Sequence, residues 1–116
     1  MKVCVTTEED FQGQVIDLAH LYGWRIAHFR PARTKYGWRT AVAGDGDGFP
    51  DCVLVRKNRD GTASLVFSEL KSEVGKVSEA QKEWLDILSK VPGLSVYLWR
   101  PSDFDEVATI LRGDSI

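Results

Sequence analysis

Residues 51–71 have the sequence DCVLVRKNRDGTASLVFSELK, and this stretch decides how the chain is expected to fold. Two β-rich runs, 51–57 and 63–71, flank the turn sequence NRDG at 58–61. Glycine tolerates the positive φ angle that a tight turn needs, so this spacing is typical of a hairpin. The two runs are therefore predicted to be neighbouring antiparallel strands.

The second run ends in a pair of opposite charges. Glu69 and Lys71 lie two residues apart, and alternate residues of a strand point to the same face. The carboxylate and the ammonium should therefore emerge side by side, with Leu70 pointing into the core. The apolar residues 65–67 indicate a buried central strand, where an unpaired charge is costly. The pair is either a contact at the exit of the strand into solvent or part of a catalytic site.

The sequence GFPD at 48–51 adds a second carboxylate at the start of the partner strand. Because the two strands pair, Asp51 and Glu69 are predicted to converge. Two carboxylates, a main-chain carbonyl, which we assign to Leu70, and water are ligands that suit Mg²⁺, with Mn²⁺ as a substitute. Lys71 would lie beside the attacking water and stabilise charge growing on a phosphate. The alternative is that Asp51 is an ordinary residue at a strand start.

The residues before this hairpin predict a helix, a strand and a loop. Thr6 or Thr7 suits the start of the helix and Gly23 suits its end. Residues 24–30 alternate like a strand, and residues 31–49, rich in Gly, Arg and Asp, predict a long mobile loop. The apolar stripe of the helix is formed by Phe11, Val15, Leu18, Ala19 and Tyr22.

The residues after the hairpin predict a helix, a strand and a short last helix. SEAQ at 78–81 is a capping box, in which Ser and Gln side chains satisfy free backbone N–H groups at a helix start. Residues 94–99 predict a strand, and a last helix should follow from residue 101. The helix after the capping box is expected to bury Trp84, Leu85 and Leu88.

The elements and the composition together predict one α/β domain over residues 1–116. The order is αβββαβα, with helices flanking a central mixed sheet, and the 43% apolar content of the 116 residues suffices for one core. No run approaches the roughly 20 apolar residues that cross a bilayer, so we expect a cytoplasmic protein without membrane association. Cys4 and Cys52 are too few for a thiolate zinc site, and no organic cofactor is suggested.

Basic charge is concentrated in one segment, although the net charge is -2. Between Asp17 and Asp45 the chain has no acidic residue and carries five of its fifteen Lys and Arg residues. A solvated loop with ordinary charges is the alternative to a surface that binds the phosphates of DNA. The residues expected to contact DNA are Arg30, Arg33, Lys35 and Arg39, with Lys76 extending the surface.

These motifs, in this order, resemble the virus-type replication-repair nuclease (VRR-NUC) branch of the PD-(D/E)xK nucleases. The resemblance rests on GFPD at 48–51, ELK at 69–71 and SEAQKEWL at 78–85, and it extends to TEEDFQ at 7–12. It implies a restriction-endonuclease-like fold and a metal-dependent endonuclease that hydrolyses DNA, branched DNA such as four-way junctions above all. Small members of the family are phage enzymes of bacterial hosts and some are homodimers, so the resemblance also implies a homodimer.

The resemblance also implies roles for individual residues. Asp51 and Glu69 would bind the metal and Lys71 would be the catalytic lysine. Gln81 would be an auxiliary catalytic residue, although its place in the capping box gives it a structural role as the alternative.

The family pattern includes an acidic residue in the first helix, where this chain offers three. Glu8 lies three residues before Phe11, on the core-facing stripe, whereas Glu9 and Asp10 are rotated from it by about 100° and 200°. We therefore choose Glu8. The alternative is that all three acids only complement the helix dipole.

Two other functions remain open at this stage. The chain could be a catalytically silent DNA-binding module of the same fold, or a small enzyme that acts on nucleotides. The presence of Asp51, Glu69 and Lys71 together argues against the first, and the basic segment favours a polymer over a nucleotide.

Overall fold

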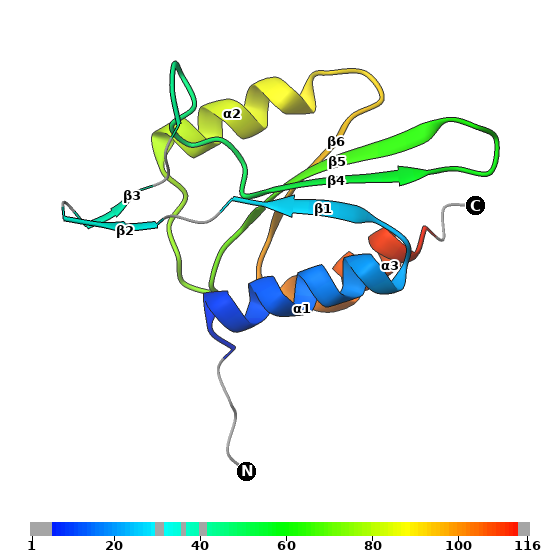
Figure 1. Cartoon of the computed structure of the whole chain (residues 1–116), viewed down its shortest axis with the longest axis horizontal. Coiled ribbons are helices and arrows are strands. Elements are labelled where there is room, and N and C mark those ends of the chain that lie inside the picture. The colour runs from blue at the N-terminus through cyan, green and yellow to red at the C-terminus, as the bar shows by residue number, and fades with distance from the viewer. Residues whose placement is uncertain (1–5, 30–31, 36, 40–41, 114–116) are drawn as a thin grey trace, which may run out of the picture.

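The computed structural model describes residues 6–29, 32–35, 37–39 and 42–113, without the side chains of 32–34 and 37–39. A four-stranded sheet lies between two helices on one face and a third helix on the other (Figure 1). The strands, in their order across the sheet, are β1 (Arg25–His28), β4 (Cys52–Lys57), β5 (Ala63–Leu70) and β6 (Ser95–Trp99). The helices are α1 (Glu8–Leu21), α2 (Glu79–Ser89), η1 (Pro101–Asp103) and α3 (Phe104–Arg112).

The pairing of the strands makes the sheet mixed, as the sequence predicts. β1 pairs with β4, and β4 with β5, in antiparallel fashion, whereas β5 and β6 are parallel. The antiparallel hairpin of β4 and β5 is closed at Gly61, whose φ of 88° is the positive angle expected of that turn. The main-sheet order αβββαβα is therefore confirmed.

The expectation of an irregular loop over residues 31–49 is wrong in one part. Two short strands, β2 (Ala32–Thr34) and β3 (Gly37–Arg39), form a separate antiparallel hairpin that projects beyond the main sheet (Figure 1). Strands of three residues show too few alternations for periodicity to reveal them. The hairpin lies in the segment that leads from β1 to β4.

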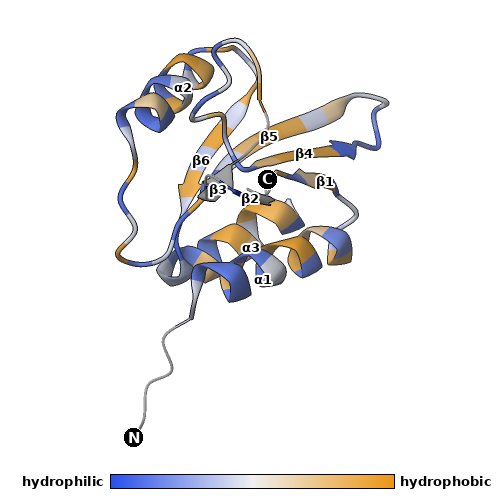
Figure 2. Cartoon of the chain, turned by 60° about the vertical axis from the view of Figure 1, so that its left-hand side comes forward, coloured by the Kyte–Doolittle hydropathy of each residue, from blue (hydrophilic) through white to orange (hydrophobic). Residues whose placement is uncertain are grey.

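One face of the sheet carries the hydrophobic core. Alternate residues of each strand point toward α1 and α3, which lie together on this side (Figure 2). The buried apolar residues are Phe11, Val15 and Ala19 of α1, Trp24, Cys52, Leu54, Val66, Leu70 and Trp99 from the strands and their ends, and Val107 and Leu111 of α3. Within the described residues no helix is long and apolar enough to cross a membrane.

Arg56 joins the ends of the two helices on this face. Its Nη1 donates to the carbonyl oxygens of Tyr22, at 3.2 Å, and Leu111, at 2.8 Å. The guanidinium also lies over the ring of Trp24, 4.6 Å from the ring centroid. Carbonyls at helix ends lack partners inside the helix, so this one side chain satisfies groups at the ends of both α1 and α3.

Among the described helices, α2 is the one on the other face, and it covers that face incompletely. Trp84, Leu85 and Leu88 were predicted to be buried, but they are half-buried, and no residue of α2 is fully buried. Ile87 is 64% exposed. The prediction is wrong because the apolar stripe of this helix contacts one side of the sheet without a second helix to close over it.

Candidate active site

Asp51 and Glu69 lie opposite one another at one end of the central hairpin. Cys52 pairs with Ser68, so the next residues of the two strands, Asp51 and Glu69, face each other. One carboxylate oxygen of Asp51, Oδ2, accepts a hydrogen bond of 3.0 Å from the backbone N–H of Leu70. This bond fixes the Asp51 side chain against β5, and both acids point to the α2 face of the sheet.

Glu69 is a buried acid with two polar neighbours. It is 1% exposed, and its Oε2 accepts a hydrogen bond of 3.1 Å from Nε2 of Gln81. The ammonium of Lys71 lies 3.7 Å from the same oxygen. The other oxygen, Oε1, is buried and accepts no hydrogen bond from the described residues. A buried carboxylate oxygen without a donor is costly, so this atom is open to a further ligand.

The surroundings of Glu69 favour its protonated form. Burial raises the pKa of Glu69 from 4.5 to about 8, and the negative charge of Asp51 acts in the same direction. The positive charge of Lys71 opposes the rise without cancelling it. A cation placed between the two acids would reverse this balance and favour two carboxylates.

Gln81 caps α2 and also contacts Glu69, while its catalytic role stays a prediction. Its backbone N–H donates to Oγ of Ser78 at 3.2 Å, and its Oε1 accepts from the backbone N–H of Ser78 at 2.9 Å. The capping box of α2 is therefore complete. The remaining amide group, Nε2, donates to Glu69, so the start of the helix and the site share one side chain.

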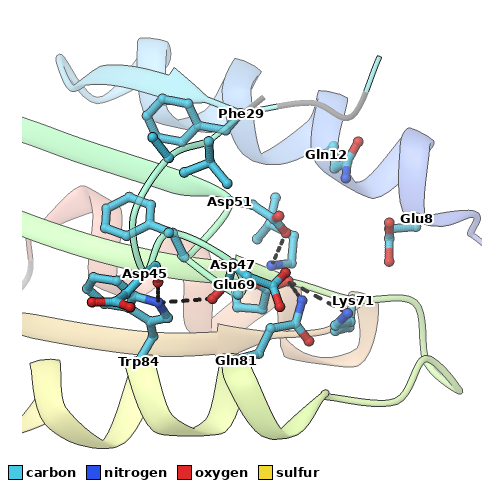
Figure 3. A pocket seen from close by; sticks show the side chains of 16 residues that line it. Glu8, Gln12, Phe29, Asp45, Asp47, Asp51, Glu69, Lys71, Gln81 and Trp84 are labelled. Carbon is cyan, nitrogen blue, oxygen red and sulfur yellow. Dashed lines mark hydrogen bonds and ion pairs between the residues drawn. The ribbon is translucent and has the colours of Figure 1, made fainter. Parts of the chain in front are cut away.

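The acids lie in a pocket of about 920 Å³ that α1, α2 and the sheet surround (Figure 3). Glu8 and Gln12 line it from α1, whereas Glu9 and Asp10 do not. All three acids are exposed, and Glu8 is the one that lines the pocket, so its catalytic role stays a prediction. Among the described lining residues, Lys71 is the one base, whereas five are acids, namely Glu8, Asp45, Asp47, Asp51 and Glu69.

The loop that precedes Asp51 is held against α2, and no local pattern in the sequence predicts this contact. The indole N–H of Trp84 donates to the carbonyl oxygens of Asp45 and Asp47, each at 3.1 Å (Figure 3). Gly48 has a φ of 83°, and a Cβ there would lie 2.6 Å from the backbone carbon of Ala80. Glycine is therefore required where this loop crosses the helix.

Aromatic rings fill the space between this loop and the sheet. Phe49 makes edge-to-face contacts with Phe29, Phe67 and Trp84, at centroid distances of 5.9, 5.7 and 5.1 Å. Such contacts stabilise a fixed arrangement of rings beyond the area they bury. The signal in the sequence was the phenylalanine of GFPD together with the tryptophan of the following helix, at 49 and 84.

The basic residues expected to contact DNA are placed only in part. Arg30 lies outside the described residues, as do the side chains of Arg33 and Arg39, whose backbones belong to β2 and β3. Lys35, between those strands, and Lys76, between β5 and α2, are exposed, and neither lines the pocket. Binding of DNA by these five residues stays a prediction.

The donor set fits a divalent cation that keeps much of its water. No group of three His, Cys, Asp or Glu side chains in the described part of the chain is arranged to enclose a metal. Mg²⁺ is usually bound through one or two carboxylates plus water and substrate phosphate, which is what Asp51 and Glu69 offer. The unpartnered Oε1 of Glu69 and the excess of negative charge in the pocket both favour a cation at this point.

Comparison with protein families gave a match that spans the main sheet and α2. The profile of the family described as the VRR-NUC domain matches residues 25–100, which is more than half of the 116-residue chain. The match includes Asp51, Glu69, Lys71 and Gln81, and it begins after α1 and Glu8. Searches of curated proteins and of solved structures gave no match.

Proposed function

The chain belongs to the VRR-NUC family of nucleases, and we propose on this premise that it is an endonuclease that hydrolyses phosphodiester bonds of DNA with Mg²⁺. The observation that supports the metal dependence is the pair Asp51 and Glu69 in a pocket lined by five carboxylates and one ammonium. A phosphate of DNA is repelled by such a pocket unless cations occupy it. The same pocket attracts divalent cations, and Mn²⁺ is expected to substitute.

The protein side chains would hold the cation and shape its surroundings. Asp51, Glu69 and the main-chain carbonyl of Leu70 are the proposed ligands. Mg²⁺ bound there would offset the two negative charges and stabilise the charge that grows on the phosphate during attack by water. No covalent bond between enzyme and DNA is required, because water is the nucleophile.

Two further residues are assigned by their contacts with Glu69. The Lys71 ammonium lies 3.7 Å from Oε2 of Glu69, where it would stabilise developing negative charge on a phosphate oxygen. Gln81 Nε2 holds the same carboxylate oxygen and so fixes which oxygen of Glu69 faces the pocket. Glu8 would contribute from the opposite wall.

We further propose that the preferred DNA is branched and that the active form is a homodimer. One site hydrolyses one phosphodiester bond, whereas a two-fold pair of sites could cut two symmetry-related strands of a four-way junction. Support for this part comes from the family resemblance of the sequence motifs. Sedimentation of the purified protein, alone and with a junction, measures the oligomeric state.

A panel of labelled DNA tests the proposal. The full chain is incubated with a four-way junction, a flap, a linear duplex and a single strand, each with Mg²⁺, Mn²⁺ or a chelator. We expect internal cuts with either metal, fastest on branched DNA, and none with chelator. Cutting in chelator would exclude the metal mechanism. Tight binding without cutting in both metals would favour the silent DNA-binding module.

A further inference from the structure

The pocket has an apolar wall that the proposed hydrolysis does not use. Phe29 and Val42 line the pocket, yet they are 44% and 53% exposed. Phe49 and Trp84 continue the same wall. Exposed apolar groups that line a concave site are typical of surfaces that receive the apolar part of a ligand.

The backbone ties this wall to the two acids. Ala27 of β1 pairs with Val53 of β4, so the next pair that points to the same face is Phe29 with Asp51. The N–H of Phe29 donates to the carbonyl oxygen of Asp51 at 2.7 Å. Neighbouring strands lie about 4.8 Å apart, which puts Phe29 one strand from Asp51 and two from Glu69. A nucleotide with its phosphate at the acids would therefore have a base within reach of Phe29.

The charges and the packing of the wall suit a base better than a phosphate. Asp45 and Asp47 line the same pocket, and their negative charge repels phosphate but not an uncharged base. The ring of Phe29 is held by its contact with Phe49, at an interplanar angle of 71°. A held ring loses little conformational freedom when a base stacks on it.

We propose that Phe29 is a stacking platform for an unpaired nucleobase next to the phosphate that is cut. The proposal rests on the proposed function in one respect, which is that the phosphate lies at Asp51 and Glu69. Bases in a duplex are covered by their neighbours, so a base must leave the stack before it can lie on Phe29. The substrate would therefore be DNA with an unpaired nucleotide at the cut, such as the strand at a branch point or a single strand.

A thermodynamic cycle that combines Phe29→Ala with the removal of one base from the DNA tests this assignment. Cleavage of DNA with an abasic site at each position around the cut is compared with that of intact DNA, for wild type and for Phe29→Ala. We expect one position where loss of the base lowers kcat/KM of the wild type by about 5- to 150-fold, the range for stacking of one base on an aromatic ring. Phe29→Ala should cut both DNAs equally slowly, and Phe29→Trp should restore the difference. An equal abasic effect in wild type and Phe29→Ala would overturn the proposal, as would no abasic effect at any position.

A control and a second measurement separate this proposal from the proposed function. Phe104 on α3 is 36% exposed and does not line the pocket, so Phe104→Ala should keep the abasic effect. The same cycle is repeated as DNA binding by fluorescence anisotropy in the Glu69→Gln background. If the wild type cuts no DNA with any metal, the proposed hydrolysis fails, but the binding cycle still decides on Phe29. If the loss of affinity on removing the base depends on Phe29, the stacking platform is supported. If the two losses of binding free energy simply add, the proposal is excluded.

Discussion

The two faces of the sheet differ in how completely they are covered. On the α1 and α3 side, Leu54 and Leu70 are almost entirely excluded from solvent, whereas on the α2 side Val55, Leu65 and Leu98 are 37% or 38% exposed. The closed face supplies the packing that holds the sheet. The open face is therefore free to carry buried charge and a pocket at the end of the strands. Stability and chemistry are in this way placed on opposite sides of the same β4–β5 hairpin.

The largest expected effect comes from removing an acid on the open face. Asp51→Asn or Glu69→Gln should lower kcat/KM for DNA at least about 10³-fold, near 4 kcal/mol, because each removes a proposed ligand of the metal. Neither should lower the melting temperature at neutral pH, because each replaces one acid of a close pair with an uncharged group of nearly the same shape. Single-turnover cleavage and thermal unfolding measure the two quantities. The matched control is Glu79→Gln, an exposed acid at the start of α2. Retention of a tenth of the activity by either variant would argue against a ligand role.

Truncations in the two faces test the comparison directly. Leu54→Ala on the closed face should lower the free energy of unfolding by about 2–5 kcal/mol, because it leaves a cavity in a close-packed core. Leu65→Ala, on the open face of the paired strand, should lower it by about 1 kcal/mol or less, because less apolar area leaves contact with water. Urea unfolding in the presence of chelator gives both values. An equal loss in the two variants would mean that the open face packs as tightly as the closed one.

The pH dependence of stability isolates the buried charge of the open face. Between pH 4.5 and about 8 the folded protein keeps a proton on Glu69 that the unfolded chain has lost, so stability falls as pH rises through this interval. Between pH 5 and pH 8, the free energy of unfolding of the metal-free wild type should fall by about 1–3 kcal/mol more than that of Glu69→Gln. This is less than the full pKa shift would give, because water that reaches the pocket screens the charge. Parallel unfolding curves for the two proteins across this range would contradict the assignment.

The smallest expected effect concerns the hold of α2 on the loop before Asp51. Trp84→Phe keeps a ring beside Phe49 and removes the N–H that two loop carbonyls accept, so it should loosen Asp51 by about 1 kcal/mol. The Mg²⁺ concentration for half-maximal cleavage should rise several-fold, with little change in turnover at saturation. Trp99→Phe on the closed face is the control, and it should alter stability alone. An unchanged metal requirement in Trp84→Phe would remove this role from α2.

Much of the fold follows from local signals in the sequence. The hairpin was predictable because NRDG at 58–61 separates two β-rich runs, and α2 was predictable from its capping box. The two runs also bring Asp51 and Glu69 together, because the length of the short turn determines which residues of the paired strands lie opposite one another. These features depend on residues that are near one another in the chain.

Other features depend on contacts between distant segments, which the sequence pattern does not specify. Phe29 lies beside Asp51 because β1 pairs with β4, and Trp84 reaches the loop at 45–47 because α2 lies over the sheet. The half-exposure of α2 could not be predicted from its apolar stripe, because a stripe does not reveal how many partners cover it. The short β2–β3 hairpin was not predicted, because strands of three residues are too short to show an alternation of apolar and polar residues.

The amide of Gln81 limits which residue can stand at the third position of α2. A capping box accepts glutamate as readily as glutamine, because only an acceptor oxygen is needed to satisfy the backbone of Ser78. Here the second atom of the amide is a donor to Glu69, so a glutamate would keep the helix intact while turning an attractive contact into electrostatic repulsion. The folding of the helix alone therefore tolerates both residues, and only the neighbouring acid discriminates between two side chains of nearly identical shape.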